Sequence, residues 1–178
     1  AEEVDRLWTA LIEGGMAMMP LDKYPFSEKY GWLTDKFGLS WQIMLVKDRP
    51  VTQKIVPSLM FTGKYYGKVQ EALDFYTAVF KNSKIEMVSK YGEGQQVDKA
   101  EAINYASFIL EGQKFAAMES GYEHKFELNG AISFIVNCQG QEEVDYYWDK
   151  LTADGGAEVQ CGWLTDKFGL SWQIMLVK

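Results

Sequence analysis

The stretch GWLTDKFGLSWQIMLVK occupies residues 31–47, and the same letters occupy residues 162–178. Each copy contains a short strand-like run and the turn signal Asp-Lys-Phe-Gly. It then continues with LSWQIML, whose alternation and β-forming residues predict a strand. Packing requires residue types rather than identical letters, so folding gives no reason for the perfect match. The identity indicates a recent duplication, a recombination, or a piece of a longer tandem protein.

A second similarity lies upstream of each copy, with EEVDRLWTALIEGG at 2–15 and EEVDYYWDKLTADGG at 142–156. Apolar residues recur at the helical spacing i, i+3, i+4, i+7 in both, and each segment ends in Gly-Gly, a helix stop. Each copy is therefore predicted to be a helix followed by strands. The stretch LDKYPFSEKY at 21–30 is expected to lengthen a loop in the first copy.

The middle of the chain has the same order of elements. Residues 54–61 read as a strand and 68–80 as a helix, and three further strands follow. An additional strand, AISFIVNC at 131–138, precedes the last helix. The fold class is therefore α+β, with paired βαβββ modules forming curved antiparallel sheets and helices outside, plus an extra N-terminal αβββ unit.

The domain boundaries follow from this order of elements. Residues 1–47 form an incomplete module and residues 48–53 a linker. Residues 54–178 form a complete domain, whose two modules are 54–120 and 131–178.

Composition excludes several classes of partner. The formal net charge is −7, and no run of Lys and Arg is long enough to follow a phosphate backbone, so nucleic acid is not expected. No apolar stretch reaches the length of a membrane helix, and the first residues lack the pattern of a signal peptide. We expect a cytoplasmic protein that binds no membrane. Cys138 and Cys161 form no CxxC pair and are expected to be free buried thiols.

EALDFYTAVF, followed by three strands, and DKFGLSWQI resemble motifs of the glyoxalase, bleomycin-resistance and dioxygenase group called the vicinal oxygen chelate superfamily. Within that group the chain is most similar to PhnB-like proteins of the 3-demethylubiquinone-9 3-methyltransferase type. Residues 54–178 resemble one whole domain, and residues 2–47 resemble the back half of another. No GxGxxG-like loop follows a strand, so the methyltransferase label gains no support from the sequence.

The resemblance also implies where a metal would bind. Metal-using members ligate one divalent ion from four strand positions, which correspond here to Pro57, Glu119, Ala131 and Gln173. Proline and alanine cannot be ligands, and a catalytic zinc site needs three protein donors. No metal ligand is assigned and no cofactor is expected, except a divalent ion acquired across a dimer. The single histidine, His124, is either solvated loop surface or a side chain that swings into the cavity.

Strand alternation predicts an apolar cavity with few polar groups, as small-molecule sites have. Glu119 is the candidate catalytic residue. It would serve as a base with a raised pKa, or else would be merely solvated or paired with a lysine. The amide of Gln173 would orient a carbonyl ligand or satisfy neighbouring groups. The tryptophans beside the turns, among them Trp163 and Trp172, read as packing residues or as a stacking wall. The expected ligand-binding residues are Leu59, Phe61, Phe115, Ser133, Ser171, Gln173 and Met175.

Three functions follow from these features. The first is a binder of a small organic molecule that needs no metal. The second is a lyase, isomerase or dioxygenase acting on a small carbonyl or aromatic substrate, with Glu119 as base or metal ligand. The third is an interaction module whose cavity is filled by its own side chains.

The incomplete N-terminal module predicts a homodimer. If Val4, Leu7, Trp8 and Leu11 faced water, about 6 to 12 kcal/mol of burial would be forfeited, which rivals the stability of a domain. This unit must therefore pack on something. It could pair with the same unit of a second chain, add to the modules of its own chain, or displace the C-terminal unit in a module swap.

Overall fold

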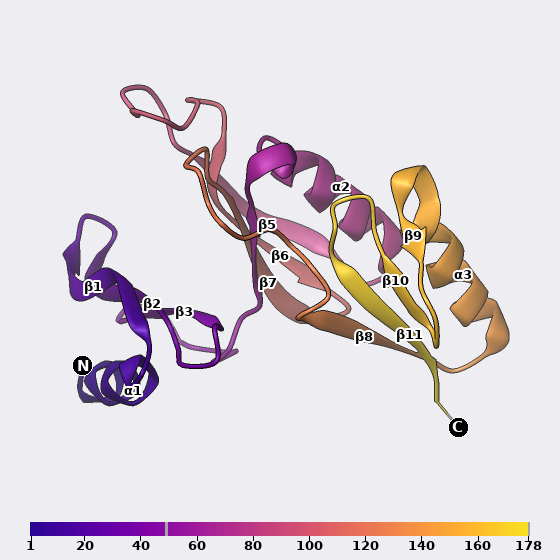
Figure 1. Ribbon diagram of the computed structural model, residues 1–178, viewed down its shortest axis with the longest axis horizontal. Coiled ribbons are helices and arrows are strands. Elements are labelled where there is room, and N and C mark those ends of the chain that lie inside the picture. Colours follow the sequence, from indigo (N-terminus) through magenta and orange to yellow (C-terminus); the bar gives the residue numbers. More distant parts are fainter. Residues whose placement is uncertain (49, 178) are drawn as a thin grey trace. The chain divides into compact units, whose positions relative to one another are not determined.

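The computed structural model describes residues 1–48 and 50–177, and the chain divides into two compact units, Ala1–Lys54 and Ile55–Lys178 (Figure 1). Each unit has its own core. None of the helices in the described residues is long and apolar enough to span a membrane.

The first unit is one helix packed on a three-stranded antiparallel sheet with the order β1-β2-β3. Val4 of the helix is buried together with Leu33 and Ile43 of the sheet. The elements of this unit are α1 (Glu2–Ile12), β1 (Met16–Tyr24), β2 (Ser27–Thr34) and β3 (Ser40–Met44).

Two expectations for this unit are wrong. Residues 21–30 are not a lengthened loop, because they form most of the β1–β2 hairpin, with Tyr24 paired to Ser27 at its tip. The apolar face of α1 also needs no outside partner, because Leu7, Trp8 and Leu11 pack against the core of the unit's own sheet.

The second unit contains two four-stranded sheets with equivalent strand orders, β4-β7-β6-β5 and β8-β11-β10-β9. In each sheet the first strand in the chain pairs in parallel with the last one, β4 with β7 and β8 with β11. The other neighbouring strands are antiparallel. The elements are β4 (Ser58–Phe61), η1 (Gly63–Tyr65), α2 (Val69–Val79), β5 (Lys84–Lys90), β6 (Ile103–Leu110), β7 (Gln113–Glu119), β8 (Ser133–Cys138), α3 (Gln141–Thr152), η2 (Ala153–Gly155), β9 (Ala157–Glu158), β10 (Trp163–Thr165) and β11 (Ser171–Leu176). The predicted α+β fold with helices outside curved sheets is confirmed.

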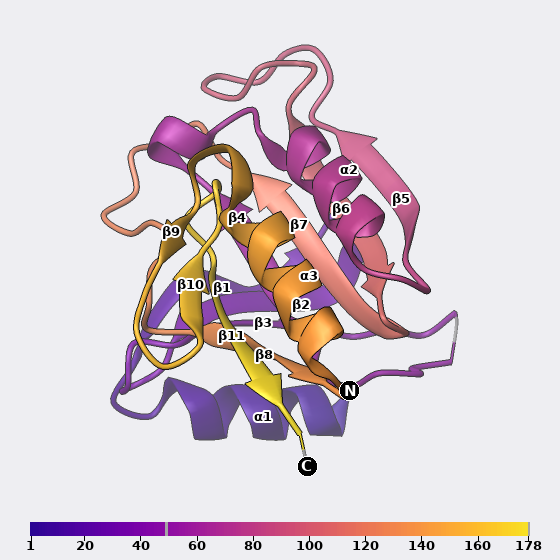
Figure 2. The ribbon, with the colours of Figure 1, turned by 90° about the vertical axis from the view of Figure 1, so that its right-hand side faces the viewer.

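Helix α2 packs on β5, β6 and β7, and helix α3 packs on β8, β10 and β11 (Figure 2). The core of the unit lies between these helices and the sheets. Its largest fully buried side chains include Tyr76 of α2, Phe61 of β4 and Leu151 of α3. One face of each sheet is therefore covered by a helix, which decides what the opposite face can do.

The two identical segments fold into the same local turn. Oδ1 of Asp35 accepts the backbone N–H groups of Phe37 (2.9 Å) and Leu39 (3.0 Å), and its Oδ2 accepts the indole N–H of Trp41 (2.9 Å). In the second copy Asp166 does the same with Phe168 (2.9 Å), Leu170 (3.1 Å) and Trp172 (2.8 Å). The sequence of the segment alone thus specifies this turn.

Candidate functional site

The candidate site is the face of the β8-β11-β10 sheet that points away from the core. Trp172 and Ile174 of β11 are buried in the core, so Gln173, between them, points to the other face. In the parallel register Gln173 lies opposite Ile135, and its Nε2 donates to Oγ of Ser133 at 2.7 Å. The amide is thereby held in one orientation on a partly exposed strand.

An indole lies beside this amide. Trp163 of β10 is the antiparallel partner of Gln173, and directly opposite residues share one face of a sheet. Ile135 and Met175, on the same face, are 57% and 42% exposed. We call this set, Ser133, Ile135, Trp163, Gln173 and Met175, the open face. It combines exposed apolar area, one aromatic ring and one oriented amide.

The sequence analysis named Ser133, Gln173 and Met175 as ligand-binding residues, offered Trp163 only as packing or as part of a stacking wall, and did not name Ile135. The missing information was the register, because the strand alternation of β11 alone does not say which residues of β8 and β10 lie opposite it. Ser171 shares the face of Gln173 but is only 4% exposed, so it lies at the covered end of this surface.

The expected convergence of Leu59, Phe61 and Phe115 on the same cavity is wrong. All three are buried in the core cluster that also contains Leu73 and Tyr76 of helix α2. The alternation was read correctly, but the wrong face was taken as the cavity. The face with the larger apolar side chains is the one that a helix covers, because its burial contributes most to folding.

The opposite face of the β4-β7 pair carries the residues that alternate with these buried ones along each strand. Ser58 lies opposite Ala116 and Met60 lies opposite Met118 in the parallel register. Because Leu59 and Ala117 point into the core, these four side chains lie on the other face of the sheet. In β4 and β7, the face away from the core is therefore formed by Ser58, Met60, Ala116 and Met118.

Glu119 is neither solvated nor paired with a lysine. It is 2% exposed, its Oε1 accepts the backbone N–H of Val69 at 2.8 Å, and its Oε2 accepts that of Ile103 at 3.0 Å. Val69 is the first residue of α2, and Ile103 is the first residue of β6. The carboxylate ties a helix start to a strand start. Its role as a base stays a prediction, and acting as one would require releasing these donors.

The residues at the four metal positions of related proteins do not fit a divalent ion. Pro57 and Ala131 have no donor side chain, both oxygens of Glu119 accept backbone N–H groups, and Gln173 bonds to Ser133. Within residues 1–48 and 50–177 no group of three or more His, Cys, Asp or Glu side chains could hold a metal ion.

Four further side chains of the unit, His124, Asn104 and the two cysteines, lie outside the open face. Nε2 of His124 lies 2.8 Å from Oγ of Ser120, and its ring packs against Phe126 with centroids 4.8 Å apart. Oδ1 of Asn104 is buried and has no hydrogen-bond partner within the described residues. Both cysteines are free as expected, but Cys161 is exposed rather than buried.

Comparison with known proteins gives the family. The family model described as 3-demethylubiquinone-9 3-methyltransferase matches residues 1–44 and 53–175. No curated protein matches the chain.

Among solved structures, the PhnB protein of Bacillus cereus is 36% identical, covers 70% of this chain and 100% of its own, and has a TM-score of 0.60. Protein PA1353 from Pseudomonas aeruginosa is 20% identical, with 70% and 98% covered and a TM-score of 0.57. A glyoxylase/bleomycin resistance protein/dioxygenase domain from Frankia sp. EAN1pec is 15% identical, with 72% and 100% covered and a TM-score of 0.47.

The sequence match and the shared fold lead to one conclusion: this chain belongs to the 3-demethylubiquinone-9 3-methyltransferase family, of the PhnB-like type.

Proposed function

We propose that the open face binds a small planar organic molecule without a metal ion. The observation that carries this proposal is the placement of one oriented amide beside one aromatic ring and two exposed apolar side chains. Small-molecule sites combine such apolar area with a few fixed polar groups. The indole of Trp163 offers a stacking surface, and the amide of Gln173 offers a donor and an acceptor for a carbonyl ligand.

Hydrogen bonding within the face supports the same reading. Because Ser133 accepts from Nε2, the amide is held before any ligand arrives, and less freedom is lost when one binds. The exposed side chains of Ile135 and Met175 would lose contact with water under a bound ring, which favours binding.

The test is a fluorescence titration of the full chain with a panel of planar aromatic aldehydes and ketones. We expect saturable quenching by at least one compound, unchanged by EDTA. In Gln173→Ala the affinity for that compound should fall about 5- to 10-fold, because one hydrogen bond contributes about 1 kcal/mol. In Trp163→Phe most of the quenching should be lost.

Gln42→Ala is the matched control, because Gln42 is the counterpart of Gln173 in the first copy and bonds instead to the hydroxyl of Tyr30 at 2.8 Å. Its titration should match that of the parent chain. Equal affinities for the parent and Gln173→Ala would contradict the proposed site. The absence of quenching by any compound would favour an interaction module, and loss of binding in EDTA would favour a metal-dependent protein.

A further inference from the structure

The two copies of the repeated segment share one local structure but have opposite surroundings. Phe168 is 2% exposed whereas its counterpart Phe37 is 84% exposed, and Leu170 is 3% exposed whereas Leu39 is 38% exposed. Since the residues and the turn are the same, the difference lies in what covers them. The first copy presents in the open a surface that the second copy buries.

In the second copy the cover is helix α2. The hydroxyl of Tyr76 donates to Oδ2 of Asp166 at 2.7 Å, and the rings of Tyr76 and Phe75 each lie 5.8 Å from that of Phe168. Oε1 of Glu71 lies 3.1 Å from Nζ of Lys167. One helix therefore contacts the acid, the lysine and the aromatic residue of the turn.

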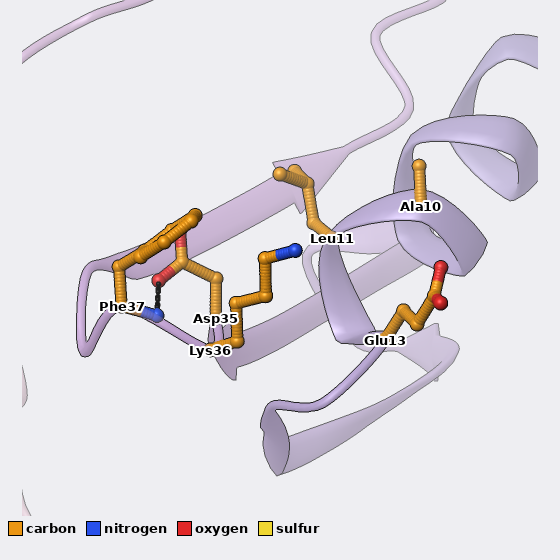
Figure 3. A pocket seen from close by; sticks show the side chains of 6 residues that line it. All are labelled: Ala10, Leu11, Glu13, Asp35, Lys36 and Phe37. Carbon is orange, nitrogen blue, oxygen red and sulfur yellow. Dashed lines mark hydrogen bonds between the residues drawn. The ribbon is translucent and has the colours of Figure 1, made fainter.

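In the first unit a hollow of about 90 Å³ lies between α1 and the turn (Figure 3). Ala10, Leu11 and Glu13 line it from the helix, and Asp35, Lys36 and Phe37 line it from the turn. The hollow thus combines apolar side chains with charges of both signs.

Contacts within the second unit show how two such modules pair. Tyr76 of α2 reaches the β10–β11 turn at Asp166, and Tyr147 of α3 reaches the β6–β7 turn, with its hydroxyl 3.5 Å from Oε1 of Glu111. In each module, therefore, one tyrosine of the helix contacts the acidic residue in a turn of the other module. A module that contains both a helix and such a turn has both halves of this contact. Two copies of it can therefore pair about a two-fold axis.

Helix α1 supplies complementary groups for this pairing. Counting from Tyr76 and Tyr147, and using the similarity of residues 2–8 to 142–148, Leu7 takes the position of the tyrosine. Glu2 then takes the position of Glu71, and Arg6 that of Phe75. Glu2 and Arg6 are exposed. By the contacts of Glu71 and Phe75, a second copy would bring Glu2 to Lys36 and Arg6 to the ring of Phe37.

We propose that the unit Ala1–Lys54 pairs with the same unit of a second copy, the α1 of each covering the Asp35–Phe37 turn of the other. Leu7, which also packs against the core of its own unit, contacts Phe37 as Tyr76 contacts Phe168. The Arg6 guanidinium lies over the Phe37 ring, in the place where Phe75 lies against Phe168.

Stoichiometry favours this occupant over a module swap. In a module swap, the first unit of one copy would displace residues 162–177 from helix α2 of another copy. Helix α2 would then cover one Asp35–Phe37 turn, but an identical Asp166–Phe168 turn would become exposed. Pairing of two N-terminal units covers both exposed turns and leaves the second units intact.

Sedimentation velocity of the full chain over about 1 to 100 µM tests the proposal. The parent chain should be dimeric, and Glu2→Lys and Lys36→Glu should each weaken the dimer at least tenfold. Combining the two reversals should restore most of the affinity, because the opposite charges then meet again. Lys23→Glu, an exposed reversal elsewhere in the unit, is the matched control and should leave the dimer unchanged.

A second comparison uses Phe37 and Val51, which are both exposed apolar residues of this unit. Phe37→Ser should weaken the dimer, and Val51→Ser should not. Circular dichroism establishes that each variant is folded. A monomer over the whole range would overturn the proposal. A dimer insensitive to both reversals, or a combined variant no tighter than the single ones, would also overturn it.

Discussion

At the scale of single residues, Asp35 and Asp166 show how surroundings alone change the chemistry of a side chain. Burial raises the pKa of Asp166, which outweighs the hydrogen bonds from Trp172 and Tyr76. For Asp35 the hydrogen bond from Trp41 is the largest influence, and it lowers the pKa. Two identical segments therefore hold carboxyl groups whose pKa values move in opposite directions.

The consequences for stability have opposite signs. The folded state binds the proton of Asp166 more tightly than the unfolded state does. This contribution to the free energy of unfolding therefore falls as pH rises above the ordinary value of 3.8 towards the raised pKa. Asp35 contributes stability above its ordinary pKa of 3.8, and that contribution is lost as pH falls through the lowered pKa.

A carboxyl-carbon NMR titration of the parent chain should show Asp166 titrating at a higher pH than Asp35. Asp35→Asn and Asp166→Asn assign the two resonances. Coincident midpoints would mean that Asp166 is not buried as the fold requires.

At the scale of elements, Glu119 is the polar anchor of helix α2. The helix has no side-chain cap from its own N-cap residue, Lys68, and Glu119 instead accepts the first helical N–H group. The same carboxylate accepts the first N–H group of β6. One buried side chain thus fixes where a helix and a strand begin.

Glu119→Gln should lower the free energy of unfolding by about 1 to 3 kcal/mol, because an amide can accept only one of the two N–H groups and leaves the other unpaired. Chemical denaturation measures the loss, and hydrogen exchange should be faster at the amides of Val69 and Ile103. Glu123→Gln, in the exposed loop, should change neither quantity. Unchanged stability of Glu119→Gln would show that the carboxylate is free for another role.

Periodicity was sufficient to predict the order and type of the main elements, because apolar spacing differs between helices and strands. It was not sufficient to choose the functional face. In β4, Leu59 and Phe61 alternate with Ser58 and Met60 whichever face is covered, and only the position of α2 decides between them. Contacts distant in sequence, such as Glu119 with Val69, leave no local pattern.

At the scale of the whole molecule, the chain joins a complete two-module unit to a unit with one helix and three strands. The sequence analysis interpreted the first unit as an incomplete module and assigned the unmet burial to the apolar face of α1. That face is satisfied by Leu33 and Ile43. The exposed surface is instead the Asp35–Phe37 turn, which only its counterpart in the second unit identifies as a contact surface.

Disulfide trapping tests the central claim most directly, namely that α1 of one copy covers the turn of another. Two full-length proteins would be prepared with the exposed Cys161 replaced by serine, one carrying Arg6→Cys and the other Phe37→Cys. Mild oxidation of the mixture should give a covalent heterodimer, with far less product from either protein alone. No cross-link in the mixture, in proteins that remain folded and dimeric, would contradict the proposed pairing.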